Sequence, residues 1–219
     1  MNPTELPEQL QAFYHDGYQL GKKAVKEVHR ETVFLEQIGI MYQAIDELID
    51  SLLAMAKRQQ VPVDCHKGCA WCCHQAVFAN SYEVHYLGDY LKKNFSLTEQ
   101  QEITRRASGK NLRTKAMSEQ EVLSYKSPCP LLTDGACSAY QARPMACRIY
   151  LSMNVATCRE FYEHPDHPDN FPALFDFPLQ AGKMMNEGFI AALKEAGILV
   201  TEFRLEEGLE TILTQGSNL

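Results

Sequence analysis

The sequence predicts a mainly α-helical protein in which helices surround loop-rich, cysteine-containing segments, with room for one small β-hairpin. Three observations indicate this: apolar residues recur at helical spacing, capping residues precede several such segments, and the cysteines lie among turn-forming residues. The chain has 219 residues, of which 45% are hydrophobic, so it can bury a sizeable core. We expect an N-terminal helical pair (1–60), a cysteine-rich core (61–160) and C-terminal helices packed on that core (161–219), in one compact unit.

The longest helix is expected between Phe34 and Met55, where apolar residues recur at alternating steps of four and three. An earlier helix is expected upstream, broken or weakened near Gly17 and Gly21, because glycine is unfavourable inside helices. We expect the two helices to form an antiparallel pair; a dimer interface is the alternative. The protein is therefore expected to be a monomer or a homodimer.

Shorter helices are expected along the rest of the chain, each from a recognisable start or stop signal. The turn at Asp134-Gly135 permits a small hairpin, and the proline-rich segment 163–172 should be a loop. The expected helices run from Asn80 or Ser81 to Asn94, after Ser96 with its capping partner Glu99, after Ser118 with Glu121, after Pro144, from Met185 to Gly197, and through Leu205, Leu209 and Ile212.

Charge and hydropathy exclude several classes of protein. The formal net charge is −7, whereas nucleic-acid binders usually carry a basic surface. No apolar stretch is long enough to span a bilayer, and the first residues contain no signal peptide pattern. We therefore expect a cytoplasmic protein that binds neither nucleic acid nor membrane, with any protein partner unidentified.

The eight cysteines are clustered, with four between Cys65 and Cys73 and three more between Cys129 and Cys147. The cytoplasm keeps thiols reduced, so disulfides are not expected. Ordinary buried thiols would be scattered along the chain, whereas clustering at short spacing is typical of metal sites. The candidate metal ligands are Cys65, Cys69, Cys72, Cys73, Cys129, Cys137, Cys147 and, less strongly indicated, Cys158.

The adjacent cysteines Cys72 and Cys73 are awkward ligands for one tetrahedral metal, because neighbouring side chains diverge. They are expected to bind different metals of a cluster, to belong to two neighbouring sites, or to be one ligand and one structural thiol. Cations should stabilise clustered thiolates. The cations expected around the site are Lys67, Arg143 and Arg148; the alternative is that they are ordinary solvated charges.

At these residues the sequence resembles the cysteine-cluster family described as putative zinc- or iron-chelating domains, named for a CxxCxxCC-type signature. The first spacing here is three residues, where the name implies two, which weakens the carry-over to Cys65. The resemblance implies a metal binder, and the flagellin lysine methylases, regarded as iron–sulfur proteins, share the pattern. The matching parts are Cys65-x3-Cys69-x2-Cys72-Cys73, Pro128-Cys129-Pro130-Leu131, Cys137-x2-Tyr140, Arg143-Pro144 and Cys147-Arg148-x-Tyr150.

Cysteine ligation suits both zinc and iron–sulfur clusters. We favour an iron–sulfur cluster, because seven or eight thiolates exceed one zinc site and an adjacent pair suits a multinuclear centre. Its role would be redox chemistry or service to a modifying enzyme. Zinc in one or two four-cysteine sites of a structural or interaction module is the alternative.

Enzymatic activity is not the favoured reading. A lysine methylase-like enzyme rests on the family resemblance alone, since no glycine-rich loop follows a strand. The segment Cys65 to Cys72 also resembles the cluster loop of radical S-adenosylmethionine enzymes, but a helix precedes it and no strand–helix alternation follows. His66 and His74, beside the cysteines, are weaker candidate metal ligands. A hard-metal site at His164, Asp166, His167 and Asp169 is a further candidate, but the prolines around these residues favour a surface loop.

Overall fold

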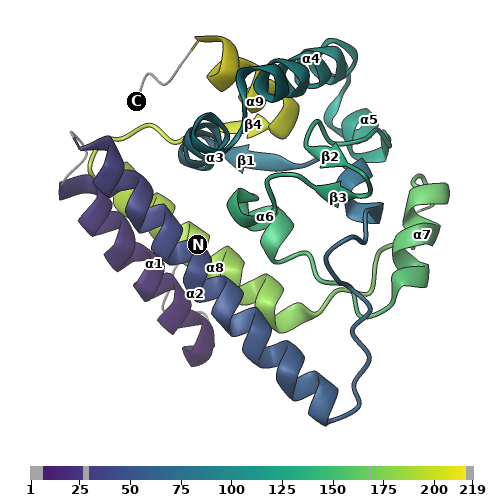
Figure 1. The fold of residues 1–219 in the computed structure, drawn as a ribbon. Helices are drawn as coiled ribbons and strands as arrows, with labels where there is room; N and C mark the ends of the chain where they lie inside the picture. Colours follow the sequence, from purple (N-terminus) through teal and green to yellow (C-terminus); the bar gives the residue numbers. More distant parts are fainter. Residues whose placement is uncertain (1–6, 27–29, 168, 216–219) are drawn as a thin grey trace. The chain divides into compact units, whose positions relative to one another are not determined.

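Figure 1 shows a computed structural model that describes residues 7–26, 30–167 and 169–215. Over these ranges the protein is mainly α-helical, with two short antiparallel strand pairs, which confirms the predicted fold class. The chain divides into two compact units. The first contains residues 1–62, 148–151 and 175–201, and the second contains 63–147, 152–174 and 202–219. The sequence-based division at residues 60 and 160 followed chain order, whereas both units here combine segments far apart in sequence.

Three long helices form the first unit: α1 (Glu8–Lys26), α2 (Glu31–Arg58) and α8 (Asp176–Glu195). They lie together in Figure 1. The long helix expected between Phe34 and Met55 is confirmed as part of α2, and its apolar face is buried at Phe34, Ile38 and Ile45. The face does not extend to the end of the helix, since Met55 is exposed.

Helix α1 is continuous through Gly17 and Gly21, so the predicted break is wrong. Both glycines allow close approach to α8. A Cβ at Gly17 would collide with the carbonyl oxygen of Met185, and one at Gly21 would lie 2.6 Å from the Cβ of Ala192. The missing side chains are used for packing, which outweighs the low helix propensity of glycine.

The larger part of the second unit is a helical layer over a two-stranded sheet. Helices α3 (Ser81–Asn94), α4 (Leu97–Thr114) and α9 (Leu205–Gln215) share one core with β1 (Phe78–Asn80) and β4 (Glu202–Arg204). The strands are antiparallel, with Phe78 opposite Arg204. The sequence did not predict this pair, because each strand has three residues and no alternating pattern. The central core residues include Leu87, Leu91, Ala107, Leu131 and Leu209.

The described residues also form several shorter elements. They are η2 (Trp71–His74), α5 (Glu119–Ser124), β2 (Leu132–Thr133), β3 (Ala136–Cys137), η3 (Tyr140–Ala142), α6 (Met145–Arg148) and α7 (Val155–Glu163). The hairpin is confirmed: Asp134 and Gly135 both have positive φ, at 50° and 76°, as a tight turn between β2 and β3 requires. Helix α7 was not predicted; its signal was Asn154, whose side chain caps the Ala156 amide.

The capping predictions are confirmed for both expected boxes. Ser96 accepts a hydrogen bond from the Glu99 amide, and Ser118 accepts one from the Glu121 amide. Gly197, with φ +77°, follows the end of α8 as expected. These local signals worked because each depends only on residues three or four positions apart.

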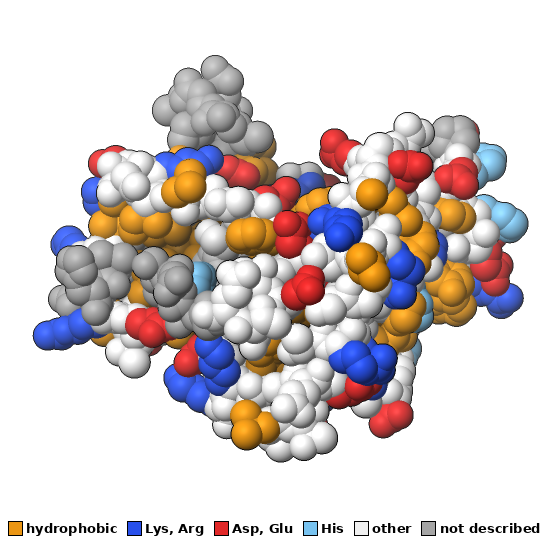
Figure 2. All heavy atoms as spheres, turned by 90° about the horizontal axis from the view of Figure 1, so that it is seen from above, with side chains coloured by type: hydrophobic (Ala, Val, Ile, Leu, Met, Phe, Trp, Pro, Cys, Tyr) orange, Lys and Arg blue, Asp and Glu red, His pale blue; other side chains and the backbone are white. Residues whose placement is uncertain are grey.

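On the face drawn in Figure 2, acidic and basic side chains of the described residues are interspersed with hydrophobic ones. Among the described residues, no helix is long and apolar enough to cross a membrane.

Gly17→Ala should destabilise the first unit by about 1–3 kcal/mol, the usual cost of overpacking, because its Cβ would meet the α8 backbone. Gly109→Ala in α4 is the matched control, since the nearest atom to its Cβ would be 3.9 Å away. That change should stabilise the protein by about 0.5–1 kcal/mol. Urea unfolding of both variants measures the difference, and equal stabilisation would contradict the assigned packing of α1 on α8.

Candidate metal centre

The first cysteine group lies on a loop that ends in the 3-10 turn η2. Gly68 has φ +100°, a conformation that glycine adopts without strain. The amide of Cys69 donates to the carbonyl oxygen of His66 at 3.0 Å, and the amide of Cys73 donates to that of Ala70 at 3.0 Å. These short-range bonds hold the loop in a compact curve.

The second cysteine group is attached to the first by backbone hydrogen bonds. The amide of Cys129 donates to the carbonyl oxygen of Cys73 at 2.7 Å, and the amide of Ser127 donates to that of His74 at 2.9 Å. The β2–β3 hairpin then returns the chain, with Leu132 paired to Cys137. Segments distant in sequence therefore meet at Cys73, Cys129 and Cys137.

Cys147 is positioned by the short helix α6 and by a buried glutamate. The amide of Met145 donates to Glu83 Oε1 at 2.7 Å. The other carboxylate oxygen of Glu83 accepts from the backbone amide of Asn80 at 2.9 Å and from its side-chain amide at 3.0 Å. Glu83 is 2% exposed, so one buried carboxylate holds both the start of α3 and the start of the Cys147 helix.

Cys65 and Cys158 are linked through Ser152. The amide of Cys65 donates to the Ser152 carbonyl oxygen at 3.1 Å, and the Ser152 side chain hydrogen-bonds the Cys158 thiol. Nearby, the Asp64 carboxylate accepts from the Val155 amide at 2.9 Å, at the start of α7. Cys158, the weakest candidate from sequence, therefore lies with the other cysteines.

Four thiols form one mutual group: Cys73, Cys129, Cys137 and Cys147. Each lies close enough to the other three for ionisation of one to raise the pKa of another. Burial is the largest cause of the raised pKa values, and it brings the pKa of Cys129 to about 12. At Cys129, Cys137 and Cys147 the neutral thiol is therefore favoured unless positive charge enters the group.

Cys65, Cys69 and Cys158 form a second mutual group. Burial raises the pKa of the Cys65 and Cys158 thiols, and the neighbouring thiols of this group add to the effect. Two thiols have neighbours in both groups, since Cys65 and Cys147 both act on the pKa of Cys72, and Cys73 acts on that of Cys65.

The adjacent thiols of Cys72 and Cys73 are hydrogen-bonded to each other. The Cys72 thiol donates to Cys73, which lowers the pKa of Cys73 to about 7 and raises that of Cys72. In a 3-10 turn, successive side chains point about 120° apart, which carries the two sulfurs towards different neighbours. The surroundings of the two cysteines overlap at Cys65 and Cys147, whereas Cys129 and Cys137 interact with Cys73.

Backbone amides point at three of the sulfurs. The amides of Leu131 and Ala139 donate to the sulfurs of Cys129 and Cys137, each two residues before the donor. The Ser152 amide donates to Cys65. Such bonds lower the thiol pKa and are the outer interactions that orient sulfur ligands around a metal.

The sulfurs are spread more widely than the ligands of one metal ion. In the ranges that the structure describes, no three cysteine sulfurs lie within 4.8 Å of one another. Around a single zinc ion with bonds of 2.3 Å, tetrahedral geometry places neighbouring sulfurs about 3.8 Å apart.

Two of the three expected cations stack on one tyrosine. The Arg143 guanidinium lies 3.8 Å from the Tyr140 ring centroid, and Lys67 Nζ lies 5.5 Å from it. Arg143 acts on the cysteines directly, since its charge opposes the raised pKa of Cys137 and of Cys147. That Lys67 stabilises the thiolates with its charge stays a prediction.

Arg148 belongs to the first unit, and the following two contacts are made there. Its guanidinium pairs with Asp46 and lies 4.1 Å from the Tyr42 ring centroid, both on α2, and the side chain is 1% exposed. These contacts pair the buried Arg148 guanidinium with a partly exposed carboxylate, and the predicted role of Arg148 beside the thiolates gains no support from them.

Sequence reasoning missed Lys110, a buried cation on α4. Lys110 is 4% exposed, and its charge acts on Cys73 and Cys129. A signal was present: Ile103, Ala107, Lys110 and Thr114 fall at helical spacing on the buried face of α4.

The histidines beside the cysteines are engaged with the backbone. His66 Nδ1 lies 2.8 Å from the carbonyl oxygen of Asp64, and His74 Nδ1 lies 3.0 Å from that of Ala70. The His74 ring also contacts Tyr162 edge-on, with centroids 5.2 Å apart. Both remain weaker candidates than the thiols.

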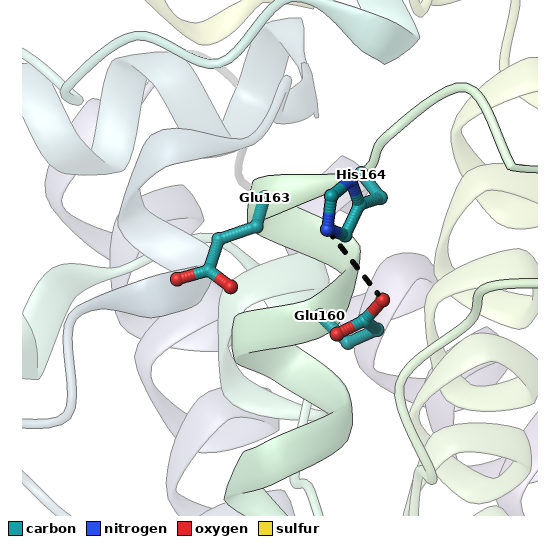
Figure 3. Close-up of side chains that lie close together, drawn as sticks. All are labelled: Glu160, Glu163 and His164. Carbon is teal, nitrogen blue, oxygen red and sulfur yellow. Dashed lines mark ion pairs between the residues drawn. The ribbon is translucent and has the colours of Figure 1, made fainter.

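A different set of possible ligands lies on the surface of α7. The ligand atoms of Glu160, Glu163 and His164 come within 4.8 Å of one another, and all three residues are exposed. Figure 3 shows His164 facing Glu160, with 3.8 Å between His164 Nε2 and Glu160 Oε1. Glu163 already pairs with Arg159 at 2.8 Å, so these groups are accounted for as surface ion pairs.

Residues 64–167 match the family model CxxCxxCC, described as a putative zinc- or iron-chelating domain. No curated protein and no solved structure gives a significant match to the chain. The matched segment contains all eight cysteines.

Glu83→Gln should destabilise the protein by about 1–3 kcal/mol. The side-chain NH2 group of glutamine would replace one carboxylate oxygen, so at least one of the three donors around this buried position would lose its acceptor. Glu99→Gln is the matched control, since Glu99 makes the same capping contact from an exposed position; its cost should stay below about 1 kcal/mol. Denaturant unfolding compares the two, and equal losses would contradict the assigned role of Glu83.

Proposed function

Residues 64–167 match the model of the CxxCxxCC family, described as a putative zinc- or iron-chelating domain, and from that match we propose that this protein holds an iron–sulfur cluster through its cysteines. The supporting observation is the convergence of thiols from separate segments of the chain, joined by the hydrogen bond between the Cys129 amide and the Cys73 carbonyl. The centre would serve electron transfer or assist a modifying enzyme.

The donor set fits such a cluster. The proposed main ligands are the four mutually neighbouring cysteines, Cys73, Cys129, Cys137 and Cys147. Iron–sulfur clusters are commonly held by four thiolates, and amides that donate to the sulfurs tune their potentials. The amides of Leu131 and Ala139 are in position for that role. The spacing between sulfurs is wider than one zinc ion requires, which also favours a multinuclear centre.

The remaining cysteines are proposed as a second ligand set. Cys65, Cys69 and Cys158 are mutual neighbours, and Cys72 lies between the two sets. This grouping gives Cys72 and Cys73 different tasks, as their adjacency demands. It also gives a specific basis for the alternative function, a zinc module with two four-cysteine sites, because eight thiols divide into two groups of four.

Anaerobic purification with metal analysis distinguishes the two. We expect a brown protein with iron and acid-labile sulfide, visible absorption that bleaches on reduction, and a paramagnetic signal in one oxidation state. A colourless protein with about two zinc ions per chain would overturn the cluster and support the zinc module. Protein with neither metal would overturn metal binding altogether.

Cys137→Ser should lower the metal content of the main site by more than half, whereas Cys158→Ser should leave that site's spectrum unchanged. The two changes are chemically identical and differ only in the ligand group they affect. Ser138→Ala controls for local disturbance, since it alters the residue next to Cys137 and removes only a hydrogen bond to Leu131. Equal metal loss from Cys137→Ser and Cys158→Ser would contradict the division into two sets.

A further inference from the structure

Lys110 is an ammonium group buried in the second unit with little to balance its charge. Its side chain projects from α4, and the residue is 4% exposed. Lysine is almost never fully buried unless it is paired, because removing an ammonium group from water is costly. Among the ion pairs found in residues 7–26, 30–167 and 169–215, none involves Lys110.

The hydrogen bond that the Lys110 ammonium group donates directs it to the cysteines. Its Nζ donates to the carbonyl oxygen of Ser127 at 3.1 Å. Ser127 lies two residues before Cys129. Its backbone amide donates to the carbonyl oxygen of His74, the residue that follows Cys73. The ammonium group is therefore held at the junction of the two cysteine segments. One carbonyl oxygen satisfies only one of its three donor positions.

The charge of Lys110 acts on both cysteines of the junction. The hydrogen bond from Cys72 is the largest cause of the lowered pKa of Cys73, and Lys110 adds to it. At Cys129, where burial raises the pKa, Lys110 opposes the increase. These effects agree with the geometry in placing the ammonium group beside the proposed main ligands.

A centre made of four thiolates needs such a cation. Four thiolates around a divalent zinc ion leave a net charge of about −2, and a cluster with thiolate ligands is also negative. In a partly buried site, water compensates this charge only weakly. Burying the negative centre or the positive ammonium group alone costs free energy, whereas burying the two together lets their opposite charges attract each other.

We propose that Lys110 is the buried counter-ion of the metal centre and retains the metal by offsetting the negative charge of its thiolate ligands. This inference rests on the proposed function. It makes Lys110 a positioning and electrostatic residue that does not itself ligate metal. The negative group that it recognises is the thiolate–metal centre of the same chain.

The test compares the rate of metal release between the unchanged protein and its variants. Each protein is purified anaerobically with its metal bound and is then mixed with excess EDTA, and the iron and zinc that remain bound are measured over time. Lys110→Met should release metal about 10- to 100-fold faster than the unchanged protein, the usual effect of losing an outer interaction at a metal site. Lys110→Arg, which keeps the charge, should release it within about threefold of the unchanged rate, by the same standard. Arg113→Met is the control, because it removes an exposed positive charge from the same helix.

The outcomes separate the two proposals. If the unchanged protein holds no iron or zinc, the proposed function and this inference both fail. If it holds either metal and Lys110→Met releases it at the unchanged rate, or Lys110→Arg releases it as fast as Lys110→Met, the inference fails whichever metal is bound. Circular dichroism checks that each variant is folded. Should Lys110→Met not fold, Lys110→Gln replaces it with the same outcomes, since glutamine is neutral but can donate a hydrogen bond.

Discussion

The hydrogen bond from the Cys129 amide to the Cys73 carbonyl oxygen, at 2.7 Å, is the contact on which the cysteine arrangement depends. It joins the loop that contains the first four cysteines to the segment that leads into the β2–β3 hairpin. The Ser127–His74 bond runs beside it and fixes the register of the two segments. Cys137 follows from the hairpin, whose backbone pairing is supported by a hydrogen bond from the Ser138 hydroxyl to the Leu131 carbonyl oxygen. Cys147 depends on a buried side chain, Glu83, which holds the start of its helix.

This convergence has an electrostatic cost that the fold must meet. Burial and neighbouring thiols raise the pKa values of Cys129, Cys137 and Cys147, so ionising these thiols without a cation is unfavourable. The amides of Leu131 and Ala139 lower that cost in part. A metal would lower it much further, which couples metal binding to the stability of the second unit.

Local features were predictable from the sequence, whereas features that depend on tertiary packing were not. The capping boxes at Ser96 and Ser118 and the turn at Asp134-Gly135 were found because each is specified by a few adjacent residues. The continuity of α1 was missed, because what keeps Gly17 helical is the backbone of α8, distant in sequence. The candidate cysteines could be identified by spacing, but their division into two groups depends on contacts between segments far apart in sequence.

Cys72 and Cys73 show how a short element resolves a conflict in the sequence. Adjacent residues in an extended strand would place their sulfurs on opposite faces, and only one could join the group. The 3-10 turn at η2 rotates successive side chains by about 120°. Cys73 then reaches Cys129, Cys137 and Cys147, while Cys72 stays hydrogen-bonded to Cys73 and near Cys65. Cys73 also acts on the pKa of Cys65, so both residues of the adjacent pair have neighbours in both groups, and a change in either group alters the surroundings of the pair.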